Sequence, residues 1–202
     1  MFTIRVALLL AISAISVSAS ANILVNGSFE LGNYTGSAGV QPIPGTSNIL
    51  PGWSATNVDW IESYWTAQHG TKSIDLSRVF AGSVEQSFVT VPGTTYSVEF
   101  FFAGNPDGNP VVKNAQVTVD SFSQIYTFDT TGFSRPNIGW VQKSFSFVAD
   151  DTAATLKFAS LDATSFGPAL DNVSVVAAVP EPATLACLGL GLVALSRRRA
   201  SR

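Results

Sequence analysis

Hydrophobic and polar residues alternate along most of the middle of the chain. In the segment 94–104, TTYSVEFFFAG, every second residue from Tyr96 to Phe102 is apolar or aromatic. The same period of two recurs in later segments, with Gly, Pro, Asn or Asp turn signals between them. The residues that share one face there are Ala115, Val117 and Val119; Val141, Phe145 and Phe147; Leu156 and Phe158; Val173 and Val175. Because alternate side chains of a strand point to one face, the pattern predicts an all-β sandwich.

Residues 32–52 break this alternation. They are rich in Gly, Pro, Ser and Asn, and we expect a long surface loop there. Between the two chain ends we find no sustained helical period and no internal repeat. Residues 22–178 are numerous enough for one domain with its own core, and we take them as the folded body.

The first residues have the composition of a secretory signal peptide. Arg5 stands in a short basic region, an apolar stretch runs from Val6 to Val17, and Ala19-Ser20-Ala21 is a cleavage site of small residues. We therefore expect residues 1–21 to be removed on export, so that the mature chain starts near Asn22.

The last residues also predict a targeting segment rather than part of the folded domain. Residues 183–195 are apolar except for Thr184. As a helix they would span roughly 20 Å, against about 30 Å of bilayer hydrocarbon. Pro180 and Pro182 block extension upstream, and three basic residues follow the run, namely Arg197, Arg198 and Arg199. This pattern favours a transient membrane contact over a buried C-terminal helix, which should be amphipathic.

The order of these parts resembles the PEP-CTERM sorting signal of bacterial envelope proteins. The segment Pro180-Glu181-Pro182 comes first, then the apolar run 183–195, then the arginine cluster. The resemblance implies that an exosortase-type membrane protease cuts near Pro-Glu-Pro and passes the body to the surface. Residues 179–202 would then be a sorting signal, with Glu181 and its flanking prolines read by the protease.

Charge and cysteine content limit the possible ligands of the body and the ways in which it can be stabilised. The whole chain has 11 Lys and Arg and 14 Asp and Glu. Removal of the two terminal segments removes Arg5, Arg197, Arg198, Arg199, Arg202 and Glu181. The body then has 6 basic and 13 acidic residues, a net charge of −7. Such an acidic body lacks the basic patch that nucleic-acid binding requires, and its negative charge attracts cations. The single cysteine, Cys187, lies in the sorting segment, so no disulfide would support the mature body.

A series of short motifs gives a second resemblance. The series comprises NILVNGSFE at 22–30, PGW at 51–53, HGTKSIDL at 69–76, the segment 83–106, GW at 139–140 and GPALDNVSV at 167–175. In this order the motifs resemble the exported bacterial proteins called choice-of-anchor C. They resemble more distantly the plant cell-wall proteins with a related domain. Both look like the galactose-binding-like jelly roll of many carbohydrate-binding modules, so the resemblance implies a jelly-roll β-sandwich.

Two carboxylates of these motifs are candidates for a calcium site. We expect the segment NGSFE to end the first strand, with Phe29 inward and Glu30 at its end. Asp171 opens the last strand and shares the parity of Val173. First and last strands lie close together in such jelly rolls, and two adjacent carboxylates repel unless a proton or a cation sits between them. The resemblance implies a structural calcium here, to which Asn26 could add an oxygen. The alternative is that both carboxylates accept backbone N–H bonds in turns.

A second oxygen-rich stretch is better explained as a turn. Asn105, Asp107 and Asn109 alternate like the first ligands of a calcium loop, but Gln116 stands where an EF-hand needs an acid. The intervening Pro and Gly residues favour the turn.

Catalytic patterns are weak. The one histidine, His69, excludes a His-x-x-x-His pair, and we expect it in a loop before a strand. Asp59 and Glu62 lie among aromatic residues, as in glycoside hydrolases. Residues three apart on a strand face opposite sides, however, so these two should not flank one bond. We therefore predict a protein that is not an enzyme.

The aromatic residues in NVDWIESYW suit binding better. Trp60 and Tyr64 could share a face, with Trp65 beside them, and flat rings in an open cleft stack on the C–H faces of sugars. Asp59 and Glu62 would bind hydroxyl groups. We expect one or two of these three rings to be exposed, whereas Trp53 and Trp140 should be buried.

These features together predict an exported jelly-roll protein of the cell surface or extracellular matrix that binds envelope or matrix polysaccharide without chemistry. A structural matrix protein with no specific ligand is the first alternative, and a weak glycoside-active enzyme is the second. A flat, polar surface over the tryptophan segment would favour the structural alternative, and an exposed aromatic cleft would favour binding.

Overall fold

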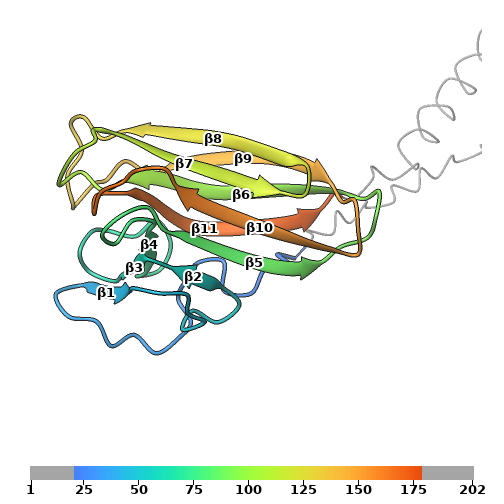
Figure 1. Ribbon diagram of the computed structural model, residues 1–202, viewed down its shortest axis with the longest axis horizontal. Helices are drawn as coiled ribbons and strands as arrows, with labels where there is room; N and C mark the ends of the chain where they lie inside the picture. Colours follow the sequence, from blue (N-terminus) through green and yellow to red (C-terminus); the bar gives the residue numbers. More distant parts are fainter. Residues whose placement is uncertain (1–20, 179–202) are drawn as a thin grey trace, which may run out of the picture.

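The computed structural model describes residues 21–178, which form two antiparallel sheets packed face to face (Figure 1). One sheet has the strand order β1-β3-β4-β11-β6-β9, and the other has the order β2-β5-β10-β7-β8. The strands are β1 (Val40–Ile43), β2 (Ser54–Thr56), β3 (Val58–Ile61), β4 (Ser73–Asp75), β5 (Ser83–Val89), β6 (Thr95–Gly104), β7 (Val112–Val119), β8 (Phe122–Asp129), β9 (Val141–Val148), β10 (Ala153–Ser160) and β11 (Pro168–Ala177). The predicted all-β sandwich is confirmed. Within residues 21–178 there is no helix that could cross a membrane.

The alternation of the long strands produces one core between the sheets. Phe100 of β6 and Phe158 of β10 are both fully buried, and their ring centroids lie 5.0 Å apart across the sandwich. Tyr126 of β8 packs edge-on against Phe100 at 5.1 Å. Every buried apolar residue of the described part lies between Leu24 and Val175. Because this core is self-contained, residues 22–178 form a unit that can be studied without the terminal segments.

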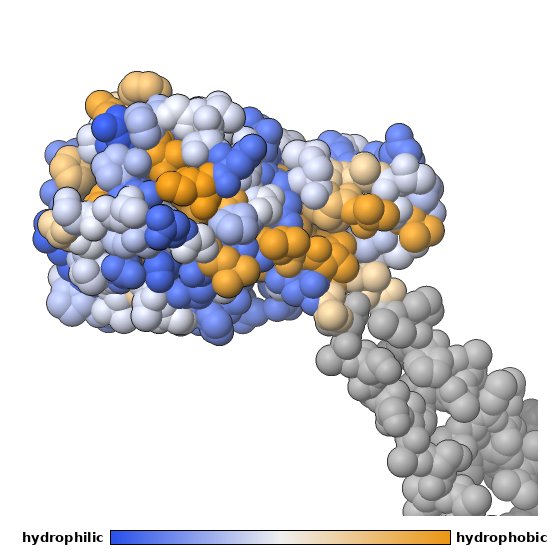
Figure 2. Space-filling view, turned by 90° about the horizontal axis from the view of Figure 1, so that it is seen from below, coloured by the Kyte–Doolittle hydropathy of each residue, from blue (hydrophilic) through white to orange (hydrophobic). Residues whose placement is uncertain are grey.

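One face of the body mixes hydrophilic and hydrophobic residues (Figure 2). Figure 2 shows separate hydrophobic patches set among hydrophilic residues on the face that it presents. The predicted signal peptide, apart from Ala21, and the sorting segment 179–202 lie outside the described residues.

Two expectations about local structure are wrong. Residues 32–52, expected as one loop, contain the short strand β1. The NGSFE segment is a turn rather than a strand end, because Asn26 and Phe29 have φ angles of 57° and 58°, in the left-handed region. Phe29 is nevertheless buried as expected, and the segment does lie beside β11, where the Val173 N–H donates to the Gly27 carbonyl at 2.8 Å.

A bulge in β11 decides where Asp171 points. Leu170 pairs with Phe102 and is buried in the core, so Asp171 faces the outer side of the sheet. The register shifts between Asp171 and Ser174, and Asn172 has a φ of 48°. The bulge returns Val173 to the core. The predicted common parity of Asp171 and Val173 is therefore wrong.

Candidate functional site

The segment that carries the predicted aromatic platform connects β3 to β4. It folds back over the outer side of the six-stranded sheet, where Asp171 of β11 receives its backbone N–H groups. Trp60 and Trp65 are both buried, with their indole N–H groups satisfied. The first donates to the Phe29 carbonyl at 3.0 Å and the second to Ser73 Oγ at 2.8 Å. The expectation that Trp60 or Trp65 stands exposed as a platform is wrong, because Trp60 lies on the inner face of β3 in register with Ile74, and the ring of Trp65 is enclosed by the returning loop.

Tyr64 is the aromatic residue of this segment that keeps access to solvent. Its hydroxyl donates to Asp107 Oδ2 at 2.5 Å, and Arg135 Nη2 donates to that hydroxyl at 2.7 Å. Arg135 Nε also donates to Asp107 Oδ2 at 2.7 Å. The guanidinium lies over the Tyr64 ring, with its carbon 3.9 Å from the ring centroid. Burial, followed by the bond to Asp107, raises the pKa of Tyr64 to about 12, so the phenol keeps its proton.

Three separate loops bring this triad together. Tyr64 comes from the β3–β4 loop, Asp107 from the β6–β7 loop and Arg135 from the β8–β9 loop. The Thr66 N–H donates to the Arg135 carbonyl at 3.2 Å, and Trp140 Nε1 donates to the Thr66 carbonyl at 2.9 Å. Trp140 is half-buried rather than buried as expected. These contacts tie the first and third loops together beside the triad.

An open hollow adjoins the triad. Its volume is ≈ 430 Å³, and it is lined by Ser63, Tyr64, Trp65, Thr66, Arg135 and Pro136. The lining combines aromatic edges with a guanidinium, and the carboxylate of Asp107 lies directly behind them. Convergent polar groups beside aromatic edges are the features of a site for a hydroxyl-rich ligand.

Asp59 and Glu62, predicted as polar partners of the aromatic platform, lie elsewhere. Glu62 is half-buried and pairs with Lys72, with Oε1 and Nζ 3.3 Å apart. Asp59 lies opposite Asp75 on adjacent strands. Neither residue lines the hollow. Their placement contradicts a shared role beside Tyr64.

Asp75 is fully buried, and Asp59 beside it is half-buried. Burial raises the pKa of Asp75 to about 8, although hydrogen bonds from Asn105, Ser77 and Gly167 oppose this shift. Burial likewise raises the pKa of Asp59 to about 6 against the opposing charge of Arg78. Asp75 is fully buried and therefore cannot reach a substrate. Burial is thus the largest cause of both raised pKa values.

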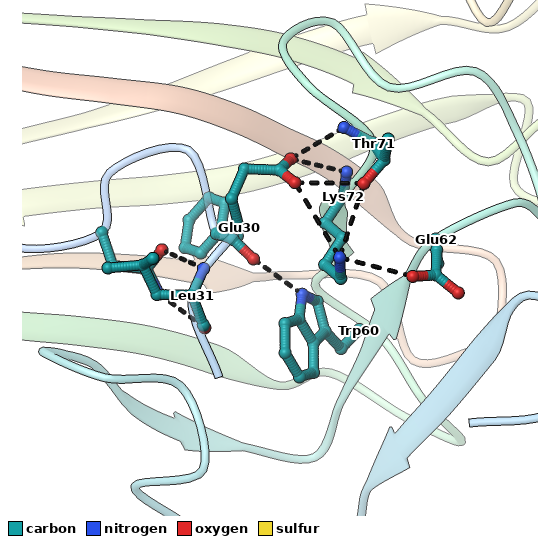
Figure 3. A network of polar contacts seen from close by, with 8 residues as sticks. Glu30, Leu31, Trp60, Glu62, Thr71 and Lys72 are labelled. Carbon is teal, nitrogen blue, oxygen red and sulfur yellow. Dashed lines mark hydrogen bonds and ion pairs between the residues drawn. The ribbon is translucent and has the colours of Figure 1, made fainter. Parts of the chain in front are cut away.

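Glu30 and Asp171 hold the end of the β3–β4 loop from two sides. Glu30 Oε1 accepts the Thr71 and Lys72 N–H groups at 2.9 and 2.7 Å, as Figure 3 shows. Asp171 Oδ2 accepts the Gln68 and His69 N–H groups at 2.8 and 2.9 Å. Burial raises the pKa of Asp171 to about 7; its N–H donors oppose this shift, and the charge of Glu30 adds to it. The sequence expectation that Glu30 and Asp171 are near neighbours agrees with this electrostatic coupling.

The contacts at this place do not fit a calcium ion. Calcium takes six to eight oxygen ligands, whereas the hydrogen-bond partners of both carboxylates here are N–H and O–H donors. Asn26 Oδ1 accepts the Leu31 N–H at 2.8 Å, so this side chain is directed to the backbone of its own loop. Within residues 21–178 no three His, Cys, Asp or Glu side chains are grouped to hold a metal. The geometry matches the alternative from the sequence, in which the two carboxylates accept backbone N–H bonds.

The turn prediction for residues 105–109 is confirmed. Asn105 Oδ1 accepts the Asp107 N–H at 3.1 Å, while Asn105 Nδ2 donates inward to Asp75 Oδ2 at 2.9 Å. The side chains of Asn105 and Asp107 therefore diverge instead of converging on a cation. His69 lies in the loop before β4, as expected.

Arg135 and the contact between Asp107 and Tyr64 were not predicted from the sequence. Asp107 lies in the predicted turn, but its partner Tyr64 is 43 positions away. Arg135 stands alone in FSRPN, and no periodicity or motif marks it. Its scarcity is the one available signal, since Arg78 is the other arginine between residues 22 and 178.

Comparison with protein families identifies both parts of the chain. Residues 22–176 match the family model described as protein of unknown function, DUF642. Residues 178–200 match the model described as the PEP-CTERM protein-sorting motif. The predicted sorting signal is thus confirmed, and its residues from 179 onward lie outside the described structure.

Individual relatives agree with this assignment. The chain is 30% identical over 187 residues to halomucin of Haloquadratum walsbyi; the match covers 87% of this chain and 2% of that protein, so the chain spans a small fraction of its length. The solved structure of TmCBM61 in complex with β-1,4-galactotriose is similar with a TM-score of 0.52 and 17% identity, covering 79% of this chain and 100% of that one. A family 16 carbohydrate-binding module has a TM-score of 0.48 and 21% identity, covering 77% and 99%. The likeness to TmCBM61 confirms the expected jelly-roll fold.

Proposed function

The chain belongs to the DUF642 family, and we propose that this member is an exported surface protein that binds polysaccharide without chemistry through the hollow beside Tyr64, Asp107 and Arg135. The PEP-CTERM motif supports export and sorting by an exosortase-type membrane protease. In this proposal the run 183–195 holds the chain at the membrane until the protease cuts near Pro180-Glu181-Pro182. The body is then retained at the cell surface or in the extracellular matrix.

The observation that carries the binding proposal is the stack of Arg135 on Tyr64. A guanidinium has five N–H groups in a fixed plane, and two point to Asp107 and the Tyr64 hydroxyl. The remaining donors are available to sugar hydroxyls. Holding the guanidinium between a ring and a carboxylate removes most of its rotamer freedom before a ligand arrives, which lowers the entropic cost of binding.

The charges favour a neutral glycan. Asp107 balances the charge of Arg135 at 2.7 Å, so the hollow has no net positive charge to attract an acidic sugar. The body as a whole is acidic, with 6 Lys and Arg against 13 Asp and Glu between residues 22 and 178. Hydroxyl groups, which donate to carboxylates and accept from guanidinium, match this neutral pair.

The fold supports the same proposal by analogy. TmCBM61 was solved with β-1,4-galactotriose and shares the architecture. Fold alone does not determine a ligand, and the specific support for binding comes from Tyr64, Asp107 and Arg135. A panel of neutral and acidic polysaccharides, offered to residues 22–178 and to an Arg135→Ala variant, tests the proposal. Binding of a neutral glycan that weakens with the variant supports it.

Burial of Trp60 and Trp65 favours a second candidate, a structural matrix protein with no specific ligand. With both indoles in the core, the surface over this segment offers Tyr64 and polar groups instead of an extended aromatic cleft. Failure of the wild-type body to bind any polysaccharide in the panel would favour this candidate. A glycoside-active enzyme is the least supported, because Asp75, the carboxylate adjacent to Asp59, is fully buried.

A further inference from the structure

The edges of the two sheets differ in how well they are protected against pairing with another chain. An edge strand exposes unpaired N–H and C=O groups, and proteins usually shorten, charge or cover it. At one edge, β1 has four residues and contains Pro42. At a second, β2 has three residues, and its outer side is covered because Ala55 and Ser47 exchange two backbone hydrogen bonds of 2.8 and 2.9 Å. At a third, β9 carries the charge of Lys143.

The remaining edge strand, β8, has none of these protections. It is eight residues long, contains no proline, and has no charged residue from Phe122 to Phe128. Its register pairs it with β7 on one side, and no strand lies on its other side in the described part of the chain (Figure 1). Within residues 21–178 no backbone or side-chain hydrogen bond beyond the β7 ladder reaches the main chain of Phe122–Asp129. The outer row of backbone groups on β8 is therefore free for another strand.

We propose that β8 is a self-association edge, which pairs antiparallel with β8 of a second copy of this chain about a two-fold axis at Ile125. In that register Ile125 lies opposite Ile125 of the second copy, and Ser123 lies opposite Thr127. Gln124 then meets Tyr126, and Phe122 meets Phe128. The pairing joins the two five-stranded sheets into one continuous sheet.

The side chains suit this register. Tyr126 and Phe128 are buried, so Ile125, which precedes Tyr126, projects from the outer face, where it is 55% exposed. Pairing covers this isoleucine with its own counterpart and sets hydroxyl groups opposite each other on the same face. Cross-strand pairs of apolar residues and of hydroxyl groups both stabilise a ladder.

Charge explains why the second copy uses this edge. The body carries 6 Lys and Arg against 13 Asp and Glu, so two copies repel in most orientations. The stretch Phe122–Phe128 is neutral, and the proposed register places Asp129 opposite Ser121 rather than opposite another carboxylate. The association is thus self-complementary in hydrogen bonds and free of like-charge contacts along the strand.

Sedimentation velocity of residues 22–178 over a range of concentrations tests this edge. We expect a concentration-dependent dimer for the wild type. Ile125→Lys and Ile125→Glu should each be monomeric, since the two-fold axis places like charges opposite each other. Both variants should melt like the wild-type monomer, because this side chain is exposed. Mixing them should restore a dimer, as opposite charges then meet at the axis.

Thr155→Lys is the matched control. It adds the same charge to an exposed position on the outer face of the same sheet, but on the central strand β10. This variant should dimerise like the wild type. The proposal is overturned by a wild type that stays monomeric at the highest soluble concentration, by loss of the dimer in Thr155→Lys, or by a mixture of the two Ile125 variants that remains monomeric. Loss of glycan binding is not a readout here, so this edge and the hollow are tested independently.

Discussion

Arg135 lies flat over the ring of Tyr64, with the guanidinium carbon 3.9 Å from the ring centroid, and both residues bond to the same oxygen of Asp107. The two residues are 71 positions apart, and the β3–β4 and β8–β9 loops bring them together. A cation stacked on a ring and paired with a carboxylate forms a rigid polar surface without net charge. This relationship is the basis of the binding proposal.

Replacing the buried tryptophans should destabilise the body. Trp60→Ala and Trp65→Ala each remove a core ring together with an indole hydrogen bond, to the Phe29 carbonyl and to Ser73 Oγ respectively. We expect a loss of about 3–5 kcal/mol in the free energy of unfolding for each. Urea denaturation of residues 22–178 measures this loss. A variant as stable as the wild type would show that the ring is outside the core.

The stability of the body should decrease as the pH rises from about 4 to about 8. The pKa of Asp75 is raised to about 8 in the fold, and that of Asp171 to about 7, both mainly by burial. The folded state therefore binds these protons more tightly than the unfolded state. Their stabilising contribution is complete below the unfolded pKa and is lost as the pH passes through the folded pKa.

Thermal melts at several pH values check this dependence. Asp75→Asn should flatten the curve, because the amide cannot ionise yet still offers an oxygen to the Ser77 and Gly167 N–H groups that Asp75 Oδ1 accepts. A wild-type melting temperature that increases steadily from pH 4 to pH 8 would contradict the assignment.

Chelation should leave the melting temperature of residues 22–178 unchanged. A ligand that binds the folded state adds stability by mass action, so a structural calcium would make EDTA destabilising. The carboxylates of Glu30 and Asp171 instead accept backbone N–H bonds. Differential scanning fluorimetry in EDTA and in excess calcium compares the two cases. A clear increase with calcium that disappears in Asp171→Ala would restore the calcium hypothesis.

The mature surface form should lack Arg197, Arg198 and Arg199. The matched sorting motif covers residues 178–200, and the apolar run before the arginines is short for a lasting anchor. Mass spectrometry of the envelope fraction identifies the C-terminal peptide. A mature protein that still ends at Arg202 would rule out cleavage near Pro180-Glu181-Pro182.

The fold was predictable because its signal is local. The alternation from Tyr96 to Phe102 predicts a strand and its buried face, and β6 follows it. The bulge at Asn172 was not predictable, since a change of register has no signature in hydrophobic period. It reverses the parity of Asp171 relative to Val173, so that Asp171 faces the outer side of the sheet and accepts the Gln68 and His69 N–H groups.

The site was less predictable because it depends on loops. Residue spacing cannot show that the β3–β4 loop returns over the sheet and buries Trp65 while Tyr64 stays accessible. Arg135 and Asp107 meet because β6 and β8 run in the same direction in different sheets, so their following loops lie at one end of the sandwich. That proximity is a property of topology, which a single sequence does not display.

Titration of a neutral polysaccharide into residues 22–178 and two variants tests the central claim most directly. The proposal predicts that the wild type binds, and that Arg135→Ala weakens binding at least about tenfold, or about 1.4 kcal/mol, without lowering the melting temperature. Lys157→Ala is the control, because it removes a surface ion pair with Glu85 within the five-stranded sheet and outside the lining of the hollow. This variant should bind like the wild type. A wild type that binds no polysaccharide, or an Arg135→Ala variant that binds as tightly as the wild type, would contradict the claim.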